Sequence, residues 1–188
     1  MSYPLDDPSA QPAYPVTRYT GEGGEISARL RRVDSAADLV TPVVSYHYLA
    51  TTASTDGEFG LYRVDMSATP SGPGTHFHRT ISESFFILSG TVRLFDGATW
   101  IDARAGDFLY VPVGGLHAFR NESGEPASLL LQFAPGAPRE AYFEGLPELG
   151  HLTDKERARF FLRHDNIFVD LGGGPNGPSG PSGPSGSN

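Results

Sequence analysis

The sequence contains no cysteine, which excludes disulfide bonds, thiolate metal sites and cysteine nucleophiles. Basic residues are also few: 14 Lys and Arg stand against 22 Asp and Glu, for a formal net charge of -8. Because phosphate binding needs a basic face, we expect no nucleic-acid partner. No apolar run approaches the roughly 18 residues of a membrane-spanning helix, and the N-terminus lacks the features of a signal peptide. We therefore expect a cytoplasmic protein with no membrane contact.

What is present is a series of short segments rich in Val, Phe, Tyr and Leu, separated by Gly, Pro, Asp and Ser. This pattern is typical of an all-β sandwich or barrel. The pairs Ser89-Gly90 and Asp96-Gly97 are expected to form hairpin turns. The predicted strands cover residues 26–33, 43–50, 59–66, 84–88, 91–95, 100–103, 108–111, 117–120 and 128–134.

Helical signals appear only after the last of these strands. Pro138 favours the first turn of a short helix, and Thr153 with Glu156 three residues later predicts a capping box for a second helix. Residues 167–171 are expected to be extended and to dock on the sheet. The chain is therefore predicted to comprise a flexible N-terminal arm (1–20), a β-barrel (21–137), a helical extension packed on the barrel (138–171) and a disordered Gly/Pro/Ser tail (172–188).

The residues with the clearest chemistry lie in two separate segments. His76 and His78 are one residue apart, so on a β-strand both side chains point to the same face. Glu83 follows after a four-residue turn. If the strand that begins at His117 lies beside this segment, three imidazoles and one carboxylate meet. Such ligands suit one divalent transition metal ion, and iron, nickel, cobalt, manganese, copper and zinc all remain possible.

Together these residues resemble the two sequence motifs of the cupin superfamily. The first motif reads His76-x-His78, four residues, Glu83, six residues, Gly90. The second reads Gly106, five residues, Pro112-x-Gly114, two residues, His117, three residues, Asn121. The first departs from the family only at its leading glycine, where this chain has Pro70. The resemblance implies a double-stranded β-helix (jelly-roll) barrel, present in one copy, and, since such barrels commonly pair, a homodimer.

The cavity of such a barrel is expected to be apolar and aromatic. Side chains that share strand parity with Glu83 or His117 should face the metal. The apolar faces of two further strands adjoin them, although parity alone leaves open which face points inward. The expected substrate pocket is lined by Tyr62, Phe85, Ile87, Phe119 and Phe133. A pocket of this kind favours a flat or aromatic small molecule.

Among cupins, a short single barrel with these ligands and a C-terminal helical extension is similar to the bacterial quercetinase-like proteins. That similarity implies a metal-dependent dioxygenase that cleaves an aromatic or enolisable substrate, with Glu83 as the catalytic base. Two alternatives stay open. One is a non-oxidative isomerase, cyclase or lyase that uses the metal as a Lewis acid, and the other is a non-catalytic cupin that binds a small molecule.

Overall fold

A computed structural model describes residues 15–170 of the 188-residue chain. The chain divides into two units, Met1–Arg32 and Val33–Asn188. Residues 15–32 contain no helix or strand. The strand expected over 26–33 is therefore wrong, and its apolar side chains Ile26, Leu30 and Val33 are exposed rather than packed on a sheet. The first strand starts at Leu39, well after residue 21. The expected disordered tail, 172–188, lies outside the described residues.

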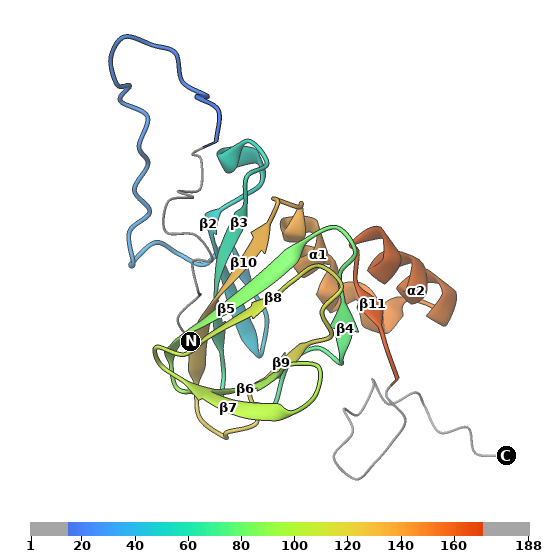
Figure 1. The fold of residues 1–188 in the computed structure, drawn as a ribbon. Coiled ribbons are helices and arrows are strands. Elements are labelled where there is room, and N and C mark those ends of the chain that lie inside the picture. Colours follow the sequence, from blue (N-terminus) through green and yellow to red (C-terminus); the bar gives the residue numbers. More distant parts are fainter. Residues whose placement is uncertain (1–14, 171–188) are drawn as a thin grey trace, which may run out of the picture. The chain divides into compact units, whose positions relative to one another are not determined.

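The second unit is built from antiparallel strands in two main sheets (Figure 1). The six-stranded sheet runs in the order β1 (Leu39–Val40), β2 (Val44–Ala50), β3 (Gly60–Met66), β10 (Ala127–Ala134), β5 (Ser82–Ser89) and β8 (Phe108–Val111). The three-stranded sheet runs in the order β7 (Trp100–Arg104), β6 (Thr91–Phe95) and β9 (Ala118–Arg120). A separate pair joins β11 (Ile167–Phe168) to β4 (His76–Phe77). This arrangement is the expected all-β double-stranded β-helix.

In the barrel core, buried and partly exposed side chains alternate strictly along neighbouring strands. On β3 the buried side chains are Tyr62, Val64 and Met66, each separated by a partly exposed residue. On β10 every second side chain is likewise buried, and Leu131 and Leu129 lie opposite Tyr62 and Val64. Because side chains of one parity share a face, these two sets form a single apolar surface inside the barrel. The structure thus decides which face points inward.

Helices follow β10, as expected. They are α1 (Arg139–Gly145), the 3-10 helix η2 (Leu146–His151) and α2 (Asp154–Arg163), while a short 3-10 helix, η1 (Ala53–Thr55), precedes β3. The capping box of α2 is confirmed: Thr153 Oγ1 accepts a hydrogen bond from the Glu156 amide, and Glu156 accepts one from the Thr153 amide. In Figure 1, α1 and α2 lie at the side of the barrel where β4 pairs with β11. Within residues 15–170, no helix is long and apolar enough to cross a membrane.

Helix α1 attaches to the barrel through aromatic side chains. Tyr142 and Phe143 are buried, and the Phe143 ring stacks on Tyr46 of β2 with ring centroids 4.6 Å apart. Phe143 also meets Tyr62 of β3 edge-on at 5.2 Å. Aromatic pairs in such offset and edge-on geometry add to the free energy gained from burial. The helix therefore closes part of the barrel's open side.

Candidate metal centre

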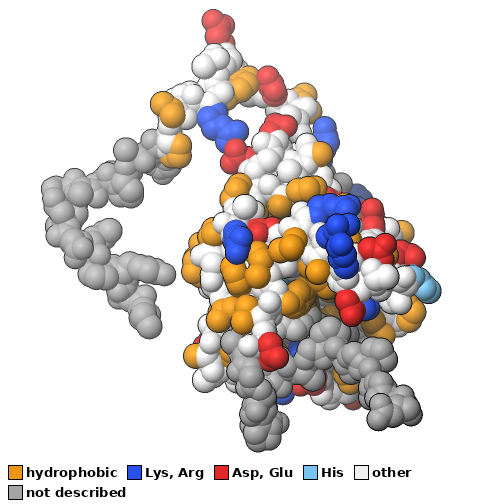
Figure 2. Space-filling view, turned by 90° about the vertical axis from the view of Figure 1, so that its right-hand side faces the viewer, with side chains coloured by type: hydrophobic (Ala, Val, Ile, Leu, Met, Phe, Trp, Pro, Cys, Tyr) orange, Lys and Arg blue, Asp and Glu red, His pale blue; other side chains and the backbone are white. Residues whose placement is uncertain are grey.

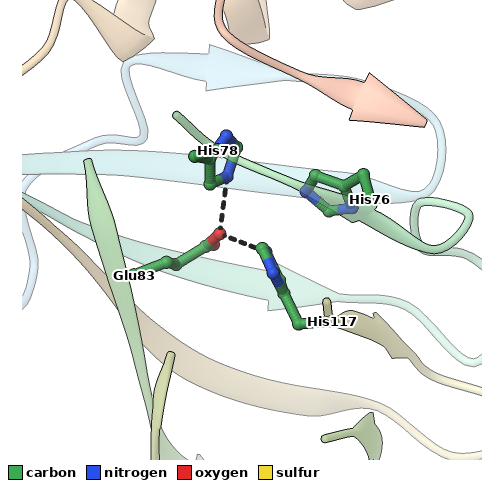
Figure 3. A group of neighbouring side chains, drawn as sticks. All are labelled: His76, His78, Glu83 and His117. Atoms are coloured by element: carbon green, nitrogen blue, oxygen red, sulfur yellow. Dashed lines mark hydrogen bonds and ion pairs between the residues drawn. The ribbon is translucent and has the colours of Figure 1, made fainter. Parts of the chain in front are cut away.

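Four residues that are distant in sequence come together inside the barrel. His76 lies on β4, His78 just beyond it, Glu83 on β5, and His117 immediately before β9. Backbone hydrogen bonds between His76 and His117, at 3.0 and 2.9 Å, hold their two segments side by side. All four side chains are buried, each offers one ligand atom, and these atoms lie within 4.8 Å of one another. Figure 3 shows the four side chains converging. The group could hold a metal ion.

Two of the imidazoles are oriented by their own loops. His76 Nδ1 lies 2.9 Å from the carbonyl oxygen of Gly74, and His117 Nδ1 lies 2.9 Å from that of Gly115. A carbonyl oxygen can only accept, so each Nδ1 carries a hydrogen and donates it. In a neutral ring the Nε2 atom then has a free lone pair, as ligation by Nε2 requires.

The third imidazole is oriented from the far end of the chain. His78 Nδ1 donates to the carbonyl oxygen of Asp165 at 2.6 Å, across 87 positions of sequence. Asp165 is the second residue after the end of α2, and its backbone lies in the left-handed region with φ 54. Its carboxylate accepts hydrogen bonds from the Arg79 amide at 3.0 Å and from the Thr80 amide at 2.8 Å and hydroxyl at 2.7 Å. The extension is therefore fastened to the turn that follows His78.

Glu83 stands between two of the histidines. Its Oε2 atom lies 3.1 Å from His78 Nε2 and 2.8 Å from His117 Nε2, as the dashed lines in Figure 3 mark. Burial alone would raise the pKa of Glu83, but the contacts with His117 and His78 outweigh it and hold that pKa well below its usual range. The Glu83 carboxylate is therefore ionised at neutral pH.

The pKa values of His117 and His76 shift in opposite directions, because only His117 has a hydrogen bond with Glu83. Burial disfavours the charged form of His117, yet the hydrogen bond with Glu83 dominates and raises the pKa of His117. His76 has no hydrogen bond with Glu83, so burial lowers the pKa of His76 to about 3. The rings of His76 and His117 lie with centroids 4.3 Å apart, and a charge on one disfavours a charge on the other.

The donor set fits a divalent transition metal ion. Three Nε2 atoms and one carboxylate oxygen are the nitrogen and oxygen ligands that such ions take in proteins. With the hydrogen of each ring held at Nδ1, His117 Nε2 and Glu83 Oε2 would both present lone pairs at 2.8 Å. That approach requires a positive charge between them, either a proton on Nε2 or a cation. The carbonyl partners of the three Nδ1 atoms provide the orientation that ligating histidines need.

A cavity of about 840 Å³ opens onto this centre. His76 and Glu83 form part of its wall, and most of the remaining wall is apolar. Of the five residues expected to line the substrate pocket, Phe119 and Phe133 do so. The apolar part of the wall also includes Val44, Tyr46, Val64, Met66, Leu131, Phe143, Leu146 and Phe161.

The other three expected pocket residues are buried but lie outside the lining of this cavity. The hydroxyl of Tyr62 donates to Glu140 of α1 at 2.7 Å, so the helix covers that ring. The Phe85 ring packs on His117 with centroids 5.9 Å apart. Ile87, further along β5 from Glu83, is completely buried. Strand parity groups side chains by face, but it does not say which face points inward or how far along the barrel a side chain lies.

Several polar residues of the wall were not expected from the sequence, among them Arg139, Tyr142 and Asn166. All three come from the C-terminal extension. Arg139 is the first residue of α1, where a positive charge is unfavourable because the helix dipole is positive at that end. This unfavourable charge is the one signal in the sequence that could have pointed to Arg139.

Figure 2 views the side on which α2 lies and shows hydrophobic side chains gathered there, bordered by charged ones.

Comparisons with known proteins agree with this geometry. Residues 63–133 match the family model of the cupin domain. The chain is 31% identical over 137 residues to quercetin 2,3-dioxygenase of Bacillus subtilis (strain 168), covering 71% of this chain but only 39% of that protein. It is 29% identical over 135 residues to polyketide synthase CurC of Streptomyces cyaneus, covering 71% of this chain and 76% of that protein.

A solved structure shows the same fold. Ectoine synthase from P. lautus superposes with a TM-score of 0.52 at 14% sequence identity, covering 63% of this chain and 86% of that chain. At this identity the similarity concerns the arrangement of strands alone.

Proposed function

Because the chain belongs to the cupin superfamily, we propose that it is a metal-dependent dioxygenase that acts on an aromatic or enolisable small molecule. One observation carries the proposal: three imidazole Nε2 atoms and one carboxylate oxygen converge, buried, at the wall of a largely apolar cavity. The 31% identity to quercetin 2,3-dioxygenase supports this chemistry. Since the match spans 39% of that protein, the substrate and the reaction are part of the proposal.

In this proposal His76, His78, His117 and Glu83 hold one divalent transition metal ion. A redox-active ion bound there would supply Lewis acidity and a path for electrons between substrate and dioxygen. The protein's own contribution is orientation, because each Nδ1 is fixed by a backbone carbonyl. The wall around the centre, which includes Met66, Leu131 and Phe133, excludes water and packs against a flat ring.

Glu83 is proposed as the base that takes a proton from the substrate. It lines the cavity, and its contacts with His117 and His78 lower the pKa of the carboxyl, so it is ionised. A carboxylate that also holds a metal ion would be a weak base, and a weak base removes a proton efficiently only from an acidic group. This property favours an enol or a phenol over an ordinary alcohol as the group that reacts.

A second candidate is a non-oxidative reaction at the same centre, such as an isomerisation, cyclisation or elimination. The match to polyketide synthase CurC favours it, because that match spans 76% of the relative rather than 39%. The ligands and the cavity would serve both reactions equally. The two candidates differ in one requirement, since only the dioxygenase consumes oxygen.

Oxygen consumption separates the two candidates. The purified protein is analysed for metals by plasma mass spectrometry, reconstituted with iron, nickel, cobalt, manganese or copper, and assayed with quercetin and with simple enols in an oxygen electrode. We expect oxygen uptake to match the loss of substrate. Product formed at the same rate without oxygen would rule out the dioxygenase and favour the second candidate.

Replacing Glu83 by Gln tests the base. Glu83→Gln keeps an oxygen ligand and the shape of the side chain but removes the charge, so we expect turnover to fall about 100-fold or more and metal content to fall much less. Glu125→Gln, at an exposed position, is the matched control and should behave as wild type. Full activity in Glu83→Gln would contradict the role of Glu83 as base.

The homodimer stays a prediction. In the second unit, β8 is an edge strand of the six-stranded sheet, and its Phe108 and Tyr110 side chains are 61% and 57% exposed. Pairing through such an edge would cover these rings and the free backbone groups of the strand. Sedimentation velocity of the wild-type protein and of Phe108→Glu tests this: we expect a dimer that the substitution weakens.

A further inference from the structure

Arg139 is a buried cation in the wall of the cavity. Its side chain begins at the first residue of α1, and the residue is only 3% exposed. Among residues 15–170, its hydrogen bonds go to a backbone carbonyl and to a side-chain amide, and none goes to a carboxylate. A buried charge without an opposite charge is costly. The described part of the chain therefore leaves the charge of Arg139 without a direct counter-ion.

Within residues 15–170, the hydrogen bonds of the Arg139 side chain are all on one of its three nitrogens. Nη1 donates to the carbonyl oxygen of His164 at 2.7 Å and to Asn166 Oδ1 at 2.9 Å. Nε is buried and has no hydrogen-bond partner, and Nη2 has none within residues 15–170. Nε and Nη2 form one edge of the guanidinium, and their two parallel N–H groups match the two oxygens of a carboxylate.

The surroundings of the guanidinium satisfy its faces but not this edge. The Tyr142 ring lies 4.1 Å and the Phe133 ring 4.8 Å from the Arg139 Cζ atom, so both make cation–π contacts. Glu83 is the only carboxylate in the described wall of the cavity, and its Oε2 atom is engaged by His78 and His117. Glu83 and Asp165 act on the charge of Arg139 through space, but no carboxylate of the described residues contacts the Nε–Nη2 edge, so an anion bound at that edge would come from the ligand.

We propose that Arg139 binds a carboxylate of the substrate, so that the cavity takes a flat, apolar organic acid with the carboxylate at Arg139. This inference rests on the proposed function, because it assigns the same cavity to the substrate, and it names the substrate class. The apolar wall receives the ring system, and the Nε–Nη2 edge receives the carboxylate. Arg139 selects acids from neutral analogues, because a neutral group would leave the buried cation uncompensated.

The test compares two probes of one shape. Binding of 2-naphthoate and of its neutral analogue 2-naphthamide is measured by isothermal titration calorimetry on the purified full-length protein. We expect naphthoate to bind about tenfold more tightly or better, because a charge-assisted bidentate contact is among the stronger hydrogen-bonding arrangements. In Arg139→Met this preference should disappear, and in Arg139→Lys it should be partly retained.

Arg93→Met is the matched control. Arg93 is a partly exposed arginine that pairs with Glu122, so its loss changes the net charge equally but leaves the cavity intact, and the preference for naphthoate should persist. Melting curves establish that each variant folds. If Arg139→Met does not fold, a crystal structure of the wild-type protein with naphthoate decides, and a carboxylate away from Arg139 would overturn the inference.

Two further results would also overturn it: equal binding of both probes to the wild-type protein, or a preference that survives in Arg139→Met. The second result would place the carboxylate elsewhere in the cavity, at the candidate metal centre or at Arg120, which also lines the wall. Neither measurement involves turnover. If the wild-type protein shows oxygen-dependent turnover but no preference for naphthoate, only the role of Arg139 is refuted. If the wild-type protein prefers naphthoate and the preference disappears in Arg139→Met, but no oxygen is taken up, only the dioxygenase is refuted.

Discussion

The barrel and the C-terminal extension contribute to the metal centre in different ways. The barrel supplies all four candidate ligands, and two of its histidines are oriented by carbonyls only two residues away, at Gly74 and Gly115. The extension supplies no ligand, yet the carbonyl of Asp165 orients His78 across 87 positions. The matched cupin domain ends at residue 133. One ligand of the centre is thus oriented from outside the region that identifies the family.

The two regions also differ in how firmly they are held. The barrel strands β3, β10 and β5 are paired along most of their length. The extension joins the barrel through two residue pairs between β11 and β4, through the carboxylate of Asp165, and through side-chain contacts of α1 such as the Tyr62–Glu140 hydrogen bond and the stacking of Phe143 on Tyr46. We therefore expect the barrel to determine whether a metal can bind, and the extension to adjust how well it binds and what shares its cavity.

The largest effect is expected from removing a barrel ligand. His117→Ala should reduce the metal content of the purified protein to background, because it removes one of four ligand atoms and leaves Glu83 without its closest partner. Metal content by plasma mass spectrometry measures this. His151→Ala, at an exposed position in η2, is the control and should keep the wild-type content. Full metal content in His117→Ala would refute the centre.

A smaller effect is expected in the extension. Asp165→Val should weaken metal affinity about tenfold, because a β-branched residue resists the left-handed backbone at φ 54 and the carboxylate contacts are lost. Asp56→Val places the same residue at φ 51, outside the metal centre, and should lower stability without changing metal affinity. Competition titrations with a chelating dye measure both. Equal affinities in the two variants would show that the extension does not tune the centre.

The pH dependence of stability tests the contribution of Asp165, which belongs to the extension. Burial raises the pKa of Asp165, but hydrogen bonds from Thr80 and Arg79 outweigh it and lower that pKa below its usual value. The contribution of the ionised Asp165 carboxylate to the free energy of unfolding is therefore fully present above the unfolded pKa of roughly 3.9. It is lost as the pH falls through the lower pKa of the folded state. Urea unfolding of metal-free protein at pH 6 and pH 3 should show a smaller loss on acidification in Asp165→Asn than in wild type or Asp56→Asn. Identical losses would contradict this.

The smallest effect is expected at the cap of α2. Thr153→Ala removes the side-chain half of the capping box and should reduce the free energy of unfolding by about 1 kcal/mol. Metal affinity should stay unchanged, because the cap lies at the opposite end of α2 from Asp165. Thr153→Ser, which retains the hydroxyl, is the control. A fall in metal affinity would mean that the whole extension, and not only Asp165, sets the orientation of His78.

Much of the fold could be read from the sequence because its signals are local. Alternation and turn residues predicted eight strands, β2, β3 and β5 to β10, with ends within about two residues of the observed ones. The Thr153 capping box predicted the start of α2. The strand predicted over residues 26–33 is wrong, because weak alternation does not make a strand without a neighbouring strand to pair with. The four candidate ligands were found because two of them share a parity and the others occupy positions of a known motif.

The pocket was only partly predictable. Phe119 and Phe133 line the cavity, whereas Tyr62 is covered by α1. Parity groups the side chains of a strand by face, but which face points inward depends on how the strands pair, and depth along the barrel depends on what covers each end. Arg139 escaped notice because its burial results from α1 folding back onto the barrel, and the only local sign of it is a positive charge at the first residue of that helix.

The sequence by itself determined the all-β barrel and the identity of the four converging side chains, because strand periodicity and motif spacing act over a few residues. Only the tertiary structure decided that His78 is oriented by Asp165 and that Arg139 lies in the cavity wall. Those contacts join positions far apart in the chain, and the packing of α1 and α2 on the barrel brings them together.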